Sequence, residues 1–199
     1  MGSYTTNYNL YKPDIDETGW GDKVNQNFDI IDEKLFIAGF EKIAEIELTE
    51  TVTSVLFENL NINNDLFYIL FFTVKNASPY STEYYLFVNN DTDTANYYSQ
   101  GLIIAGDGTT AARVNKPLIC HATNASSVFC KVTITKDAFS YFRAFSFANF
   151  DTASSVKFEI ASVCKTETVD NITSLTLQSS QLNGLAESSK FLLFRARKV

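Results

Sequence analysis

The sequence predicts an all-β protein, an antiparallel β-sandwich of the jelly-roll-like kind that follows an extended arm and one short α-helix. Two observations support this fold class. From Phe40 onward, short runs of aromatic and β-branched residues alternate with clusters of Asn, Asp, Gly and Ser that favour turns. The composition also includes 17 Phe and 10 Tyr but only one Trp and one Met, and aromatic residues suit the half-buried surface of a pleated sheet.

The first 38 residues differ from the rest, and we expect them to form a separate segment beside a sandwich domain at residues 39–199. Residues 1–17 are polar, lack periodicity and contain Pro13, which indicates an extended arm. The arm has neither a basic stretch nor an apolar one, so we expect no signal peptide. A Gly-Trp-Gly-Asp turn at residues 19–22 then precedes a helix.

An apolar stripe identifies this helix, which we expect from about Trp20 to Phe36. Its members, spaced by four, three and four residues, are Val24, Phe28, Ile31 and Leu35. This spacing is typical of a coiled coil, and so short a helix is marginal alone in water. Two interpretations stay open: the helix packs on its own sandwich, or it associates with copies of itself or with a larger assembly. We favour association.

We expect the strands of the sandwich in short apolar runs separated by turn clusters. The run at residues 66–74 is apolar on both faces, which indicates a central strand. The clusters at residues 89–96 and 105–110 are predicted to be turns. The strands are expected at residues 52–57, 66–74, 83–88, 100–105, 114–122, 127–134, 138–147, 155–164, 172–178 and 190–199.

The chain is acidic, with a formal net charge of −7 and an isoelectric point near 4.7. This excess of carboxylates disfavours binding to nucleic-acid phosphates or to an anionic membrane surface. The apolar runs are also too short to insert across a membrane. The cysteines are Cys120, Cys130 and Cys164. Their odd number and wide spacing predict buried, reduced thiols, without disulfides or a zinc site.

The sequence contains no recognisable catalytic or cofactor-binding motif, so we expect no enzyme, no cofactor and no metal. His121 is the only histidine, and its neighbour Cys120 would point to the opposite face of a strand. We therefore expect a structural histidine. The turn at residues 89–96, NNDTDTAN, has oxygen atoms that could surround Ca²⁺, but it lacks the spacing of an EF-hand. We favour a hairpin turn, and ion binding there stays open.

Residues 9–32, NLYKPDIDETGWGDKVNQNFDIID, resemble the N-terminal module of many tailed-phage virion fibre proteins. The matching features are an arm that contains Pro13, the Gly-Trp-Gly-Asp turn, and a helix with an Asn-x-Asn-Phe core at residues 25–28.

The rest of the chain is similar to a phage tail-fibre β-sandwich module. In that module an opening strand (here FEKIAEIEL) precedes a VxF strand, and a later strand runs into an Asn-rich Asp-Thr turn (here FVNNDTDTANYY). A final apolar strand, here SSKFLLFRARKV, closes the domain. The family often has Gly where this chain has Asn90, a change that is tolerated at positive φ.

The resemblance implies a structural virion protein without enzymatic activity, of the tail-fibre or head-fibre type and generally a homotrimer. Such a protein is made in the host cytoplasm, attaches to the tail, baseplate or capsid through its N-terminal part, and points its β-domain outward. We expect Pro13, Trp20 and the apolar helix stripe to serve anchoring and oligomerisation. The alternative is that Trp20 fixes the helix to its own sandwich.

A host-surface glycan is the expected receptor class. Four tyrosines are candidates for stacking on sugar rings: Tyr80, Tyr84, Tyr97 and Tyr98. They could equally form cross-strand pairs that stabilise the sheet. Two further hypotheses are a lectin-like carbohydrate-binding module and a capsid decoration protein without a receptor role. A glycan hydrolase is disfavoured because the sequence defines no acid pair.

Overall fold

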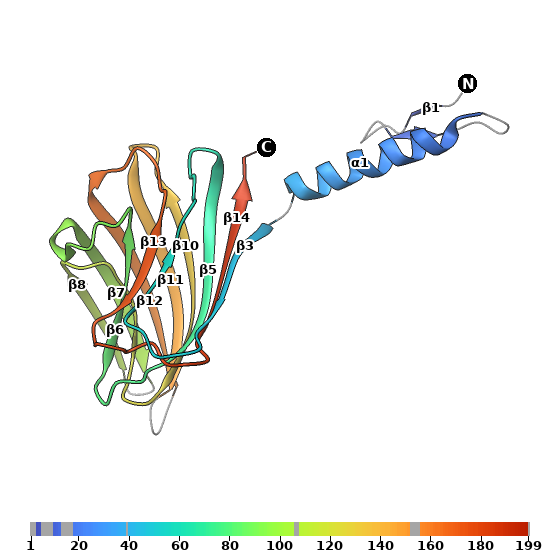
Figure 1. The fold of residues 1–199 in the computed structure, drawn as a ribbon. Helices are drawn as coiled ribbons and strands as arrows, with labels where there is room; N and C mark the ends of the chain where they lie inside the picture. The colour runs from blue at the N-terminus through green and yellow to red at the C-terminus, as the bar shows by residue number, and fades with distance from the viewer. Residues whose placement is uncertain are drawn as a thin grey trace.

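The main body of the molecule is a sandwich of two antiparallel sheets, preceded by a helix and two short strands (Figure 1). This arrangement confirms the predicted all-β sandwich with one short helix. The computed structural model describes residues 3–4, 10–12, 18–38, 40–105, 108–151 and 156–198.

The larger sheet contains eight strands. In chain order these are β3 (Phe40–Glu47), β5 (Asp65–Lys75), β7 (Tyr97–Ala105), β8 (Gly108–Val114), β10 (Ser127–Lys136), β11 (Tyr141–Asp151), β12 (Val156–Thr168) and β14 (Lys190–Arg197). Across the sheet the order is β3-β14-β5-β10-β11-β12-β7-β8. The first and last strands of the sandwich therefore lie side by side at one edge.

The smaller sheet contains four strands, β4 (Ser54–Phe57), β6 (Thr82–Val88), β9 (Leu118–Ala122) and β13 (Leu175–Ser179), in the order β4-β13-β6-β9. The chain passes repeatedly from one sheet to the other, and a short 3₁₀ helix, η1 (Thr94–Asn96), precedes β7. Because the smaller sheet has half as many strands, it covers only part of the larger one. Beyond β9, the edge strand β8 is exposed along nearly its whole length.

Most strand predictions agree with the structure, and one is wrong. β5 lies between β14 and β10, as its apolar run predicts. The cluster at residues 105–110 is more than a turn, because β8 begins at Gly108 and pairs with β7. β8 has the sequence GTTAARV, whose residues are mostly exposed at a sheet edge, so its apolar signal is weak.

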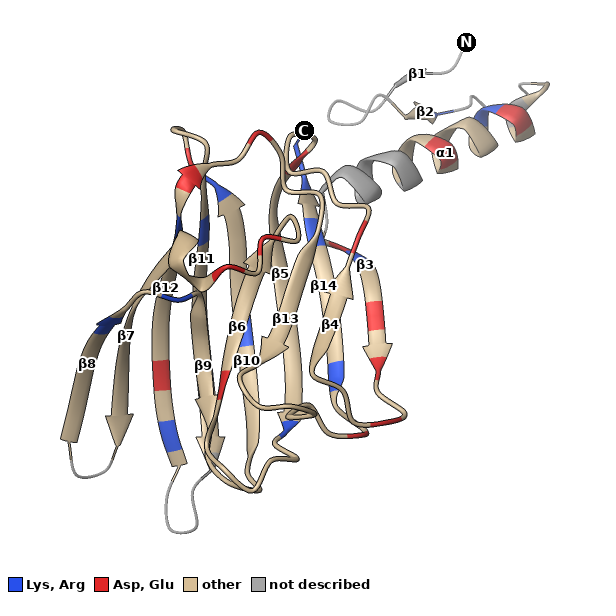
Figure 2. Cartoon of the chain, turned by 60° about the vertical axis from the view of Figure 1, so that its left-hand side comes forward, with Lys and Arg blue, Asp and Glu red and all other residues tan. Residues whose placement is uncertain are grey.

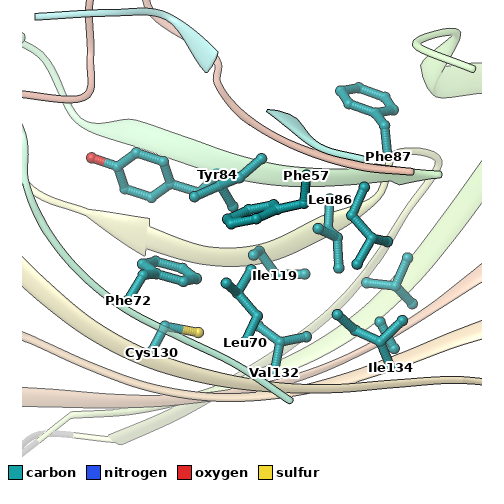
Figure 3. Packing of buried hydrophobic residues seen from close by; sticks show 14 of the residues in the cluster. Phe57, Leu70, Phe72, Tyr84, Leu86, Phe87, Ile119, Cys130, Val132 and Ile134 are labelled. Carbon is teal, nitrogen blue, oxygen red and sulfur yellow. The ribbon is translucent and has the colours of Figure 1, made fainter. Parts of the chain in front are cut away.

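The core lies between the two sheets (Figure 3). Alternate residues of β5 and β10, among them Leu70, Phe72 and Val132, face Leu86 and Ile119 of the smaller sheet. All five are buried, and each large apolar side chain stabilises the fold by roughly 1.5–3 kcal/mol. The three cysteines are buried, as predicted, and each is free.

Helix α1 (Trp20–Ala38) spans the residues where the apolar stripe predicts it. Figure 1 shows it projecting away from the sandwich. Within the part of the chain that the structure describes, no helix combines the length and apolar character needed to cross a membrane.

The described parts of the arm, which the sequence predicts to be extended, are two short strands. β1 (Ser3–Tyr4) pairs antiparallel with β2 (Tyr11–Lys12). Pro13 and Gly39 lie outside the described residues.

Candidate functional site

Helix α1 presents the described part of its apolar stripe to solvent. Val24 is half-buried, whereas Phe28 is 63% exposed and Ile31 is 36% exposed. The side chains of Trp20 and Leu35 lie outside the described residues. The helix contacts β2, and in Figure 1 it covers neither sheet. Among the described residues, Phe28 and Ile31 are therefore left exposed on the helix surface.

Asn27 fixes the arm to this helix. Its side-chain oxygen accepts a hydrogen bond from the Tyr11 amide at 2.6 Å, and its side-chain nitrogen donates to the Tyr11 carbonyl at 2.6 Å. The Lys23 ammonium lies 5.7 Å from the centroid of the Tyr11 ring. A side-chain amide can donate and accept at once, which gives a physical reason for asparagine within the Asn-x-Asn-Phe core.

The four tyrosines do not form one sugar-stacking surface, and the prediction is wrong for two of them. Tyr84 and Tyr97 are buried in the core. The Tyr97 hydroxyl donates to the Asp91 carbonyl at 2.9 Å, and the Tyr84 hydroxyl donates to the Gly184 carbonyl at 3.3 Å. A buried tyrosine whose hydroxyl finds a backbone acceptor is stable in a core, so residue type alone could not place these side chains.

Tyr80 and Tyr98 are accessible but lie apart. Tyr80, which is 67% exposed, precedes β6. Tyr98 lies on β7, and the centroid of its ring is 5.1 Å from the Arg113 guanidinium carbon. The seven residues of β6 separate these two positions, a length of about 20 Å. One sugar ring cannot contact both.

The carboxylate of Asp91, in the turn at residues 89–96, is engaged by protein donors. It accepts a hydrogen bond from the Asn96 side chain at 3.0 Å and forms an ion pair with Lys165 at 2.9 Å. Burial alone would raise the pKa of Asp91, but the hydrogen bonds from Lys165 and Asn96 lower it overall. Asn89 and Asn90 have φ values of 55° and 59°, typical of asparagine in a turn. Among the described residues, no group of three or more side chains could hold a metal ion.

A charged cluster surrounds His121 of β9. The Oε2 atom of Glu159, on β12, accepts a hydrogen bond from the His121 backbone amide at 2.9 Å. Its Oε1 atom lies 2.8 Å from the ring Nδ1 of His121. Glu83 of β6 lies 3.7 Å from the ring Nε2. It accepts hydrogen bonds from Lys116 at 2.5 and 2.6 Å and from the Tyr85 hydroxyl. Every carboxylate oxygen of the cluster therefore has a donor.

Neighbouring charges set the protonation of this cluster. Burial lowers the pKa of His121, but the hydrogen bond to Glu159 and the charges of Glu159 and Glu83 outweigh it and raise the pKa above 6.5. Burial raises the pKa of Glu83, but hydrogen bonds from Lys116 and Tyr85 lower it overall. With all carboxylate oxygens hydrogen-bonded, the cluster is suited to holding β9 against β12.

The outer face of the larger sheet, opposite the core, carries a belt of phenylalanines. Phe71 contacts Phe194 and Phe129, with ring centroids 5.9 and 6.5 Å apart. Phe147 contacts Phe145 and Phe158, with ring centroids 4.8 and 6.1 Å apart. We call these six residues the aromatic face. Four of these six rings, those of Phe129, Phe145, Phe147 and Phe158, are exposed.

Strand register places the two groups of rings on either side of one lysine. Phe71 of β5 pairs with Lys131 of β10, which pairs with Phe147 of β11. Phe129 is 48% exposed and Phe147 is 40% exposed. Figure 2 shows few charged residues along the central strands of this sheet. The face therefore combines exposed rings with a low density of charge.

Sequence reasoning does not identify the aromatic face. A strand that is apolar on both sides is expected to be buried on both, and the run at residues 66–74, which includes Phe71, has this character. One signal was available: the sequence after Gly39 predicts no helix that could cover a second apolar face. Alternating phenylalanines opposite the core side then imply an uncovered surface.

No protein-family model matches the chain, and no curated protein is significantly similar to it. Its function is therefore inferred from these surfaces and from the resemblance of its N-terminal segment.

Proposed function

We propose that this chain is a structural protein of a bacteriophage virion. In this proposal it is a small, self-associating fibre that residues 1–38 hold to the particle, and it displays residues 39–199 toward the host surface. The observation that carries the proposal is the position of α1, which projects from the sandwich and exposes Phe28 and Ile31. The resemblance of residues 9–32 to the N-terminal modules of phage fibre proteins supports it further.

Self-association follows from the spacing of the helix stripe. Residues spaced by four and three positions bury themselves when parallel helices pack together, and a homotrimer is the assembly that the resemblance implies. Phe28 and Ile31 would then lie between helices. Asn27 would hold each arm beside its own helix, through the paired hydrogen bonds to Tyr11.

Particle attachment is assigned to the arm and to Trp20. Tryptophan is enriched among the residues that dominate interfaces. The proposal is equally compatible with attachment to the tail, the baseplate or the capsid. A capsid decoration protein would attach in the same way but would bind no host receptor. For a host glycan, Tyr80 and Tyr98 are the accessible tyrosines among the four candidates.

Purified virions provide the test. Antibody or gold labelling should find the protein on the particle, and its absence from virions would refute the proposal. The variant Trp20→Ala should weaken attachment by about 2 kcal/mol or more and leave thermal unfolding of the sandwich unchanged. Normal incorporation with a lowered melting temperature would instead show that Trp20 packs on its own sandwich.

A further inference from the structure

We infer that another copy of this chain covers the aromatic face in the assembled protein. The inference rests on the self-association proposed above and assigns it a second surface. The helix stripe and the aromatic face belong to separate elements, so each can be tested by itself.

The size of the face matches that of a protein interface. The six rings lie in three registered rows that cross six strands, from β14 to β7. With strands about 4.8 Å apart and residues of one face about 6.7 Å apart along a strand, these rows cover on the order of 600 Å². This footprint includes polar residues such as Asn149 and Thr133 as well as the rings, and it approaches the about 800 Å² per partner of a standard interface.

The charges of these rows favour another copy over other partners. Between β14 and β7 the three rows contain Lys131 and Lys190 but neither Asp nor Glu, whereas Glu47 and Glu45 continue two of the rows on the edge strand β3. Two copies that each carry a net charge of −7 repel least when they meet through the part of the face that has no acids. A basic partner would be drawn to the acidic remainder of the surface, and an anionic membrane would repel the chain.

The composition of the face also fits an interface between copies. Interfaces within homo-oligomers are more apolar than the general protein surface, and their centres are depleted of charge and enriched in aromatic residues. Lys131 is the one charged residue between the two groups of rings. Its long stem can lie along the rings of Phe71 and Phe147.

Thiol labelling of the full chain tests whether the face is covered. The native cysteines are buried, so a single added cysteine reports on its own position. Asn149 is exposed and lies in one row between Phe129 and Phe158. We expect Asn149→Cys to react with a maleimide on the order of tenfold more slowly in assembled protein than in dilute monomer, because interface centres exclude solvent.

Ser54→Cys is the matched control, since Ser54 is exposed on the smaller sheet. Its labelling rate should not change with assembly. If Asn149→Cys reacts as fast as Ser54→Cys in assembled protein, no copy covers the face and the inference is overturned. A full chain that is monomeric at every concentration would also overturn it.

A pair of substitutions tests whether the rings contribute affinity. Phe129→Thr with Phe147→Thr removes two exposed rings, and threonine favours a strand. We expect this variant to dissociate at a concentration roughly tenfold higher than the wild-type chain. Phe139→Thr with Leu182→Thr is the control, because these residues are 80% and 83% exposed and lie outside the sheet. Equal dissociation of both variants would contradict the inference.

The two surfaces can fail independently. If Phe28→Ser weakens assembly while Asn149→Cys stays reactive, the helix-based proposal stands and the aromatic face is not an interface. If Phe28→Ser has no effect while Asn149→Cys is protected, the sheet is the interface and the role proposed for the helix is wrong.

Discussion

Among single residues, Glu159 has a side-chain carboxylate that lies between the two sheets and is almost fully buried. Both of its oxygens interact with His121, one with the ring and one with the backbone amide. A buried acid is tolerated only when it is paired in this way. This pair therefore fixes β9 against β12 at the side of the sandwich that the smaller sheet leaves uncovered.

The raised pKa of His121 predicts a pH-dependent contribution to stability. A group whose pKa is raised on folding stabilises the fold below its unfolded pKa, near 6.5, and loses this contribution as pH rises through the folded value. The groups facing the ring are Glu159, Glu83 and Lys116. The free-energy difference between wild type and His121→Gln should therefore be largest below about pH 6.5 and shrink as the pH rises through the folded pKa of His121.

Urea denaturation at a series of pH values measures this difference. Each unit by which the folded pKa exceeds the unfolded one corresponds to about 1.4 kcal/mol. A difference that is constant with pH, or that grows as pH rises, would show that His121 is not held in its charged form.

Asn27 predicts a local effect on the arm. Asn27→Leu has a similar size but loses both hydrogen bonds to Tyr11, each worth about 1 kcal/mol. Hydrogen exchange at the Tyr11 amide should therefore become faster, while the amides of the sandwich exchange as before. Asn25→Leu, at an exposed position on the same helix, should leave Tyr11 protected. Equal protection in both variants would mean that other contacts hold the arm.

At the scale of elements, helix α1 and the larger sheet share one property: each has an apolar surface that the other described residues leave exposed. A helix of 19 residues gains little stability alone. Its order in the full protein should therefore depend on the partner that buries its stripe.

Substitutions on the helix test this dependence. Phe28→Ser with Ile31→Ser should reduce both self-association, by roughly tenfold or more in dissociation constant, and the helical signal in circular dichroism at low concentration. Gln26→Ser with Asp29→Ser changes exposed polar positions of the same helix and should affect association little. If both variants associate equally well, the stripe is not an interface.

At the scale of the whole molecule, the sandwich holds its entire described core. The buried apolar cluster begins at Val55 and ends at Leu193, and no described side chain of α1 belongs to it. Deletion of residues 1–38 should therefore leave the melting temperature of the sandwich nearly unchanged and reduce self-association. Calorimetry and light scattering of the full and shortened chains measure both effects. A large drop in melting temperature would show that the helix packs on the sandwich.

The sequence predicted the positions of the helix and the strands better than it predicted which of their side chains are buried or exposed. The helix follows from a stripe of four residues, and β5 follows from its apolar run, because these signals are local. β8 was missed because its exposed residues give no apolar pattern. The burial of Tyr84 and Tyr97 depends on which carbonyls lie across the core, a fact of tertiary structure that residue type does not reveal.

For the same reason, the sequence predicted one candidate surface, the helix stripe, but not the other, the aromatic face. The helix stripe is visible in one continuous segment, whereas the six rings of the aromatic face come from five strands. Only the order of the strands brings Phe71, Phe129 and Phe147 together. The bonding of Asn27 to Tyr11 likewise depends on a fold of the arm that its polar composition did not indicate.

The position of β14 in the sheet determines when β3 can pair during synthesis of the chain. β3 joins the larger sheet through β14, which lies between β3 and β5. β14 follows the other described strands in the sequence, so the edge strand β3 gains its neighbour in the sheet only once β14 has been synthesised. In a chain truncated before Lys190, β3 would have no pairing partner, and α1 would be joined to the sandwich through an unpaired strand.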